Sequence, residues 1–383
     1  MVERPVLTTQ LQPVPGVIDL GVGQPQDAIL PVSLIARAMM AAAAARQSYP
    51  LQYGAERGDA QLRSTLAEFL GVRYGTAVAV EQLLISNGNS QAIDLCCAVF
   101  TKPGDVVFVE EPTYFLALQI FADHGLRVVG IPVDDNGLRI DALAAELANH
   151  SPRLVYTIPT GQNPTGSSMP VERRRQLVAL AREAGFLVLA DEVYQLLDYS
   201  GSPPEPLAAQ VDSGVVLSLG TFSKILAPGL RLGWIQASEE LLDVLAVRGQ
   251  LLSGGGLNPY VSAVVAPMLG DGSVAGYLDD LRDTLHRRLI AMDEALSAHV
   301  PPGVTYRRPQ AGYFFWLTFP HEVDTAALRP AALAAGVGFQ PGPVFSTRGG
   351  GANCLRLSFS YYGEADIRDG VGALCHAFAA TTG

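Results

Sequence analysis

The chain has 383 residues, of which 49% are hydrophobic and 16% charged. This balance excludes a disordered protein, because disorder requires less apolar content and more charge. A formal net charge of −11 without a basic block argues against nucleic acid or a membrane as a partner. The first ten residues lack a signal-peptide pattern, and the four cysteines show neither zinc-site nor disulfide-framework spacing, so we expect a cytoplasmic protein.

Short β-rich runs alternate with helical patterns between residues 83 and 237. The expected strands are 83–86, 106–109, 127–131, 154–158, 186–190, 215–219 and 232–236, and the expected helices are 91–100, 113–124, 141–148 and 171–184. Apolar runs of this length with few polar breaks are typical of strands buried on both faces. The pattern therefore predicts an α/β fold, in which a mostly parallel, seven-stranded sheet lies in a three-layer α/β/α arrangement.

The pattern changes after a long helical stretch at 273–299. The remainder offers strands at 312–318 and 354–359 and helices at 324–335 and 364–379, which predicts a smaller α+β domain. We divide the chain into an N-terminal arm and helix that packs on the small domain, a large domain and a small domain, at residues 1–46, 47–285 and 286–383.

Only two of the 26 basic residues are lysines, Lys102 and Lys224. Lys102 lies in an expected surface turn, whereas Lys224 interrupts the apolar, glycine-containing run 218–231. Burial there would lower the pKa of the amine, and a deprotonated amine is a group that arginine cannot supply. We interpret Lys224 as a reactive amine; the alternative is a lysine at a strand end whose charged head reaches solvent.

The segment 84–94 has the pattern of a strand, a glycine-containing turn and the start of a helix. Such a turn points free backbone N–H groups and the helix dipole at one place, which favours an anion. Alternatively, Ser90 only caps the helix. A third reading is a hydrolase nucleophile, because Gly88-x-Ser90-x-Ala92 approximates the G-x-S-x-G motif.

Other candidate residues follow the expected strands. Tyr114 could lie over a flat ring or pack in the core. The loop 160–166 presents the Asn163 amide to a ligand, or forms an Asx turn without one. Asp191 ends a buried strand, where an unpaired carboxylate is costly, so we expect a cationic partner.

Two arginines complete the set. Arg231 could bind a phosphate or form a structural ion pair, and Arg356 points either to solvent or into a cleft that holds a substrate carboxylate. A buried amine, an acid for a ring nitrogen, an aromatic cover, a donor for a phenolic oxygen and an anion cradle together fit pyridoxal phosphate. The dinucleotide fingerprint is incomplete at Gly21-Val-Gly23, and the sequence has no Walker-type loop.

At this point the chain resembles the fold-type I pyridoxal phosphate-dependent aminotransferases of class I/II, near the 2-aminoadipate and kynurenine aminotransferase branch. The resemblance runs from about Ile18 to the C-terminus. The motifs that carry it are Gly21-x-Gly-x-Pro25, Tyr53-Gly, Asn163-Pro-Thr-Gly166, Ala190-Asp-Glu-Val-Tyr194, Ser-Lys224, Pro-Gly-Leu-Arg231 and Leu-Arg356-Leu-Ser-Phe359.

The resemblance implies a role for each matching residue. Lys224 would form the internal aldimine with pyridoxal 5′-phosphate and then move a proton, while Asp191 would keep the pyridine nitrogen protonated. Arg356 would bind the substrate α-carboxylate, with Gly23 and Asn163 also at the substrate. Tyr114 would stack on the cofactor ring, and Asn163 and Tyr194 would bind its phenolic oxygen. The phosphate would be held by Ser90, Gln91, Thr221, Ser223 and Arg231. Tyr53 would reach the phosphate of a neighbouring subunit, which implies a homodimer with sites at the interface, and Asn258 would be a second contact across it.

The implied activity is transfer of an amino group from an L-amino acid to a 2-oxo acid. The aminoadipate branch has an arginine after its Gly-x-Pro segment, but this chain has Asp27 there, which leaves a dicarboxylate donor unsupported. Two alternatives stay open. One is elimination, replacement or carbon–carbon bond formation with the same cofactor, for example on S-adenosylmethionine in specialised biosynthesis. The other is a serine hydrolase that uses Ser90.

Overall fold

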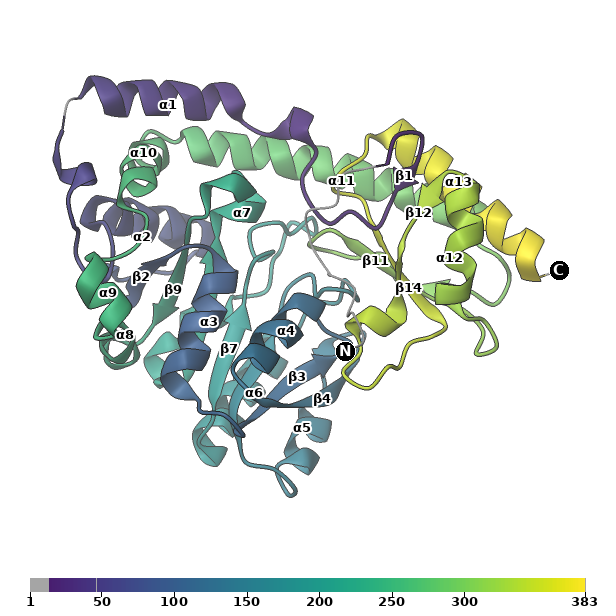
Figure 1. The fold of residues 1–383 in the computed structure, drawn as a ribbon, viewed down its shortest axis with the longest axis horizontal. Helices are drawn as coiled ribbons and strands as arrows, with labels where there is room; N and C mark the ends of the chain where they lie inside the picture. The colour runs from purple at the N-terminus through teal and green to yellow at the C-terminus, as the bar shows by residue number, and fades with distance from the viewer. Residues whose placement is uncertain (1–13, 46, 383) are drawn as a thin grey trace, which may run out of the picture.

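The structure is a computed structural model that describes residues 14–45 and 47–382. The chain forms a large part around one mixed β-sheet and a smaller part around a second sheet. A long helix, α11 (Ser273–His299), runs from the large part toward the small one (Figure 1). The expected α/β fold with a smaller α+β unit is confirmed.

Within the described residues the large sheet has eight strands, in the order β2-β9-β8-β7-β6-β3-β4-β5. Their bounds are β2 Leu83–Ser86, β3 Val106–Glu111, β4 Arg127–Asp134, β5 Gly137–Leu138, β6 Pro152–Thr157, β7 Leu187–Asp191, β8 Val216–Thr221 and β9 Gly233–Ala237. Strands β4, β3, β6, β7 and β8 are parallel, whereas β9 is antiparallel to β8 and β2. The expected seven strands are present; the eighth, β5, is a two-residue hairpin partner of β4 and too short to leave a periodic pattern.

The large sheet is buried on both faces, because alternate residues of its strands belong to two separate hydrophobic cores. On β3, Val107 and Val109 pack in one core, and Val106 and Phe108 pack in the other. The helices of the large part are α2 Ala60–Tyr74, α3 Asn89–Phe100, α4 Phe115–Asp123, α5 Ile140–Glu146, α6 Val171–Ala184, α7 Phe222–Ile225, α8 Glu239–Ala246, α9 Gly249–Gly254 and α10 Pro259–Gly270. Residues of α3 and α4 complete the first core, and residues of α5 and α6 complete the second.

The small part contains a four-stranded antiparallel sheet in the order β10-β11-β14-β13, counted over the described chain. Its elements are β10 Thr305–Tyr306, β11 Phe314–Thr318, α12 Thr325–Ala334, β12 Val337–Gly338, β13 Gln340–Pro341, β14 Cys354–Ser358 and α13 Glu364–Thr382. Helix α13 packs along α11. Short 3-10 turns lie at Asp27–Ile29, Tyr49–Leu51, Val80–Gln82, Leu207–Ser213, Pro228–Leu230 and Gly342–Phe345.

The N-terminal arm connects the two parts. Strand β1 (Ile18–Asp19) pairs in parallel with β12 of the small part, and helix α1 (Val32–Ala44) then extends over α10 (Figure 1). The boundary that we place between 285 and 286 falls inside the continuous helix α11, and our division into domains stays a prediction.

No single helix in the described ranges is long and apolar enough to cross a membrane. Only the pair α10 and α11, bent by 80° at its break, reaches that length and apolarity together.

Candidate active site

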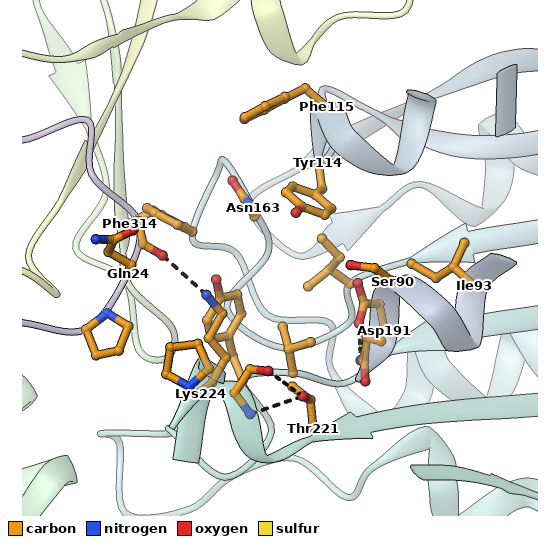
Figure 2. A pocket seen from close by; sticks show the side chains of 18 of the residues that line it. Gln24, Ser90, Ile93, Tyr114, Phe115, Asn163, Asp191, Thr221, Lys224 and Phe314 are labelled. Carbon is orange, nitrogen blue, oxygen red and sulfur yellow. Dashed lines mark hydrogen bonds between the residues drawn. The ribbon is translucent and has the colours of Figure 1, made fainter. Parts of the chain in front are cut away.

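A cavity of about 550 Å³ lies where the carboxyl ends of the large-sheet strands meet the N-terminal arm and strands β11 and β14. Most of the residues singled out in the sequence line it: Gly23, Ser90, Tyr114, Asn163, Asp191, Tyr194, Thr221, Ser223, Lys224, Arg231 and Arg356. Figure 2 shows the labelled members of this set pointing into one pocket. Segments more than 300 residues apart in the chain thus build a single site.

Lys224 lies on α7, directly after β8. Figure 2 shows Lys224 in the pocket. Its Nζ atom donates a hydrogen bond to the Gly23 carbonyl oxygen at 3.2 Å and lies 5.2 Å from the centroid of the Tyr313 ring. Burial, assisted by the positive charge of Arg356, lowers the pKa of Lys224 to about 8. A larger share of this amine is therefore deprotonated, and able to accept a proton, near neutral pH than in a solvent-exposed lysine.

Asp191 ends β7 and is buried, with both carboxylate oxygens occupied. Tyr156 Oη donates to Oδ2 at 2.7 Å, and Asn89 Nδ2 donates to Oδ1 at 2.5 Å. Burial raises the pKa of Asp191, while these two hydrogen bonds and the nearby Lys224 oppose the rise. We expected a cationic partner within the chain; among the described residues none forms an ion pair with Asp191, and its direct partners are neutral donors.

A cradle of hydrogen-bonding groups forms where the turn before α3 meets the segment after β8. The Arg231 guanidinium donates to Ser223 Oγ at 3.2 Å and to the Asn87 carbonyl at 3.1 Å, and Ser223 N–H donates to Thr221 Oγ1 at 3.1 Å. Over the described chain Arg231 forms no ion pair, so the interpretation as a structural salt bridge is wrong.

The turn itself depends on Gly88, which has a φ of +80° and precedes the first residue of α3. A Cβ atom at Gly88 would lie 2.8 Å from Arg231 Nη2. Only glycine adopts this backbone without strain, and only glycine leaves room for the arginine. Ser90 is the second residue of α3, beside the positive end of the helix dipole.

Two aromatic residues and one amide complete the middle of the site. The Tyr114 ring lies 5.7 Å from the Phe115 ring at the start of α4, and the Tyr194 ring lies 5.2 Å from that of Tyr313. Asn163 follows β6 in a loop and accepts a hydrogen bond at Oδ1 from Arg356 Nη1, at 2.8 Å. The Asn163 loop is thus joined directly to the small part of the molecule.

Arg356 points from β14 into the cavity and not to solvent. Its guanidinium carbon lies 4.0 Å from the centroid of the Phe314 ring, and Nη2 donates to the Gly21 carbonyl at 2.9 Å. Arg356 is 4% exposed, and its Nε atom is buried and has no hydrogen-bond partner among the described residues. A buried donor without a partner is costly, so this group is suited to a ligand that accepts hydrogen bonds.

Three expected contacts do not line the cavity. Gln91 uses its side-chain oxygen to accept from the Asn87 N–H at 3.1 Å, which supports the turn. Tyr53 is 82% exposed on the surface. Asn258 donates to the carbonyl oxygens of Leu230 (3.0 Å) and Arg231 (2.6 Å) within its own chain, so it holds the backbone beside the cradle.

The hydrolase hypothesis lacks a base. None of the histidines in the part of the chain that the structure describes lines the cavity beside Ser90. His150 packs against Phe108, and His376 contacts the Gly372 carbonyl on α13. A Ser–His pair for nucleophilic catalysis is therefore not formed.

Sequence reasoning missed Asn89 and Tyr156, the two partners of Asp191. Asn89 lies between Gly88 and Ser90, which drew attention as the turn and the anion site, and Tyr156 lies inside an apolar strand. The only available signal was a polar hydroxyl within an otherwise apolar strand, since a buried tyrosine usually finds a hydrogen-bond partner.

The family described as "Aminotransferase class I and II" matches residues 15–374. The chain is 36% identical to aromatic-amino-acid aminotransferase 1 of Thermococcus litoralis, over 94% of this chain and 87% of the relative. A kynurenine aminotransferase of Pyrococcus horikoshii, solved with PMP, superposes with a TM-score of 0.90 at 34% identity, covering 96% of this chain and 92% of the other.

An α-aminoadipate aminotransferase of Thermus thermophilus, solved with N-(5′-phosphopyridoxyl)-L-leucine, superposes with a TM-score of 0.88 at 32% identity, over 98% of this chain and 95% of the other. The chain belongs to the class I and II aminotransferases. It is a pyridoxal phosphate-dependent transferase of amino groups, as the sequence motifs predicted.

Proposed function

We propose that this chain binds pyridoxal 5′-phosphate at Lys224 and transfers an amino group from an L-amino acid to a 2-oxo acid. The observation that carries the proposal is the placement of three groups around one cavity. An amine with a pKa of about 8, a buried carboxylate and a buried arginine with an unpartnered nitrogen all line it.

The residues present fit the cofactor. Among the described residues, the Arg231 guanidinium has only neutral hydrogen-bond partners, and Gly88 leaves room for it, so the cradle suits a phosphate. We assign the phosphate to Ser90, Thr221, Ser223 and Arg231, with Gln91 supporting the turn. Asp191 would hold the ring nitrogen, Asn163 and Tyr194 would donate to the phenolic oxygen, and Tyr114 would cover the ring.

When bound, pyridoxal phosphate supplies an electron sink that weakens the bond between the substrate Cα and its hydrogen. The chain's own residues do the rest. Lys224 Nζ accepts the proton from Cα, for which its lowered pKa suits it. Asp191 holds a proton at the ring nitrogen, and Arg356 fixes the substrate α-carboxylate with its planar guanidinium.

The far end of the cavity favours a donor with an uncharged side chain. Among the described lining residues the cations are Lys224, Arg231 and Arg356, and each already has an assignment. Asp27 also lines the cavity and would repel a second carboxylate. We therefore expect apolar or aromatic L-amino acids to be better donors than glutamate or 2-aminoadipate.

We further propose a homodimer in which Tyr53 reaches the phosphate of the partner's site. Helix α1 is strongly apolar, yet none of its residues is buried, and Met40 is 65% exposed. Leu51 and Tyr53, at the following turn, are 75% and 82% exposed. An apolar surface of this kind indicates a protein contact, and a second copy of the chain is the partner that would use Tyr53.

A titration of the purified holoenzyme tests the function. Each amino acid of a panel, and S-adenosylmethionine, is added while the visible absorbance is recorded and the products are identified by mass spectrometry. Amino transfer predicts bleaching of the visible band with one oxo acid released per site. Loss of a substrate side-chain fragment without that bleaching would assign the enzyme to elimination or replacement instead.

A further inference from the structure

The Asp191 carboxylate has an unusual environment for a charged group. It is 3% exposed, and within the described chain no lysine or arginine forms an ion pair with it. A carboxylate in such a place loses its hydration and tends to take up a proton. The groups that donate hydrogen bonds to Asp191 therefore contribute directly to keeping it charged.

Tyr156 is one of these donors. Its ring is fully buried on β6, the strand beside β7, and its hydroxyl donates to Asp191 Oδ2 at 2.7 Å. Burial raises the pKa of the Tyr156 hydroxyl well above its usual range, so the group stays protonated and remains a donor. As a donor to Oδ2, it stabilises the charged form of Asp191.

Asn89 is the second donor and approaches the other oxygen. Its Nδ2 atom donates to Asp191 Oδ1 at 2.5 Å and to the Leu219 carbonyl of β8 at 3.1 Å. Both N–H groups are thus used, which fixes the amide with its nitrogen toward Asp191. The Asn89 Oδ1 atom is buried and, among the described residues, has no partner. The hydrogen bonds that hold the Asn89 side chain are therefore the two that its nitrogen donates, to Asp191 and to the Leu219 carbonyl.

The titratable groups around Asp191 pull in both directions. Lys224 on α7 favours the charged form of Asp191. The acidic Glu192, which follows Asp191 in the chain, disfavours that form. The other titratable groups that interact with Asp191 are Glu110 on β3, Tyr114 at the start of α4, and Tyr194 after β7. Lys224 would bind the cofactor and lose its free charge. The two neutral donors, Asn89 and Tyr156, would then continue to stabilise the charged form of Asp191.

We propose that Asn89 and Tyr156 are positioning residues that keep the Asp191 carboxylate ionised and thereby keep the cofactor's ring nitrogen protonated. The second half of this inference rests on the proposed function of the site. The first half concerns only the protein. With either donor removed, Asp191 becomes a stronger base, and the shared proton moves from the ring nitrogen toward the carboxylate.

The holoenzyme tests the inference through the ring nitrogen itself. The full chain is loaded with pyridoxal phosphate that carries ¹⁵N in the ring, as wild type, Tyr156→Phe and Asn89→Ala, and the ¹⁵N resonance is recorded across a pH range. In each variant we expect the resonance to lie closer to the position of an unprotonated ring nitrogen. The ratio of protonated to unprotonated ring nitrogen should fall about tenfold. Resonances that match wild type in both variants would overturn the proposal.

The cofactor-free full chain provides an independent readout. The infrared carbonyl band of protonated carboxyls is titrated with pH, and the share of Asp191 is identified by subtracting the Asp191→Asn spectrum. Each single variant should raise the titration midpoint by about one pH unit, which is a tenfold change in proton affinity. The same subtraction with Glu110→Gln identifies the neighbouring buried carboxyl, whose pKa burial raises to about 7.

Tyr199→Phe is the matched control, because it also removes one tyrosine hydroxyl that donates a hydrogen bond, here to the Gly312 carbonyl at 2.8 Å. It should leave both readouts at the wild-type values. A wild-type chain that takes up no cofactor would contradict the proposed function, yet the infrared titration would still decide the role of the donors. An infrared midpoint that Tyr156→Phe and Asn89→Ala leave unchanged would overturn the inference even if the cofactor binds.

Discussion

At the scale of single residues, burial determines the chemistry of this site. Lys224 and Arg356 are both cations that line the cavity, and burial lowers the pKa of each, to about 8 and about 10. The consequences differ because the lysine can release its proton in the working range whereas the arginine stays charged. One is therefore suited to accept a proton and the other to hold an anion.

The cofactor-free protein should reveal the lowered pKa of Lys224 in its stability. Between pH 8 and 10.5 the unfolded chain binds this proton while the folded chain does not, so the contribution of Lys224 to stability rises with pH. Relative to Lys224→Met, we expect wild type to be less stable at pH 7, by about 3 kcal/mol at most. Urea unfolding should show the gap closing between pH 8 and 10.5; a gap independent of pH would contradict the lowered pKa.

Replacing Arg356 by lysine keeps the charge but removes the planar pair of donors. Charge-assisted hydrogen bonds contribute about 1.5–3 kcal/mol, so we expect KM for donor and acceptor to rise about 10- to 150-fold. Steady-state kinetics check this, and the visible band of the bound cofactor should not change. The exposed Arg307→Lys is the control. Unchanged KM values for both substrates would remove Arg356 from the substrate site.

At the scale of elements, the turn between β2 and α3 brings the backbone of the large sheet to the anion cradle. Gly88 has a φ of +80°, a backbone conformation that residues with side chains rarely adopt. The guanidinium of Arg231 lies next to Gly88, and Arg231 itself has a left-handed backbone with φ +46°. The strained Arg231 backbone thus contacts a turn that only glycine can form without strain, which is typical of a turn whose shape serves a binding site.

We predict that Gly88→Ala weakens cofactor binding more than it weakens the fold. The new Cβ would displace the Arg231 guanidinium and adds about 1–3 kcal/mol of backbone strain. Equilibrium dialysis of pyridoxal phosphate against the cofactor-free protein measures the first effect, and thermal unfolding the second. Gly75→Ala also has a positive φ, but nothing lies within 4 Å of its Cβ, so it should lose stability without losing affinity. Equal affinity in both variants would contradict the cradle.

The elements that could be predicted from the sequence are those with a local pattern. The strands of the large sheet are apolar runs between polar turns, and Lys224 stands out because the chain has only one other lysine. The pairing of Asn89 and Tyr156 with Asp191 had no such pattern, because it depends on three segments meeting in space. The position of Arg356 over Phe314 likewise follows from the pairing of β11 with β14, which no short stretch of sequence encodes.

At the scale of the whole molecule, the site depends on both parts of the chain. Asn163 in the large part and Arg356 in the small part share a hydrogen bond of 2.8 Å, and the arm supplies the Gly21 and Gly23 carbonyls. Substrate binding at Arg356 would therefore act on the contact between the two parts. On the outside, α1 and the turn after it leave an apolar surface uncovered.

The dimer proposal predicts that charges on α1 separate the subunits. Met39 and Met40 are 45% and 65% exposed, and glutamate at both positions would be buried without a partner in an interface. Sedimentation velocity should show a dimer for wild type and monomers for the double variant, which would also lose activity. Leu333→Glu on α12, where Leu333 is 40% exposed, is the control and should remain dimeric. A monomeric, active wild type would contradict the shared site.

Chemical mapping of the lysines tests most directly whether Lys224 carries the cofactor. Borohydride makes the bond between pyridoxal phosphate and a lysine amine permanent, and the chain has only Lys102 and Lys224 to choose from. After reduction and proteolysis, mass spectrometry should find the phosphopyridoxyl group on the Lys224 peptide alone. Its absence from that peptide, or its presence on Lys102 instead, would contradict the account of the site.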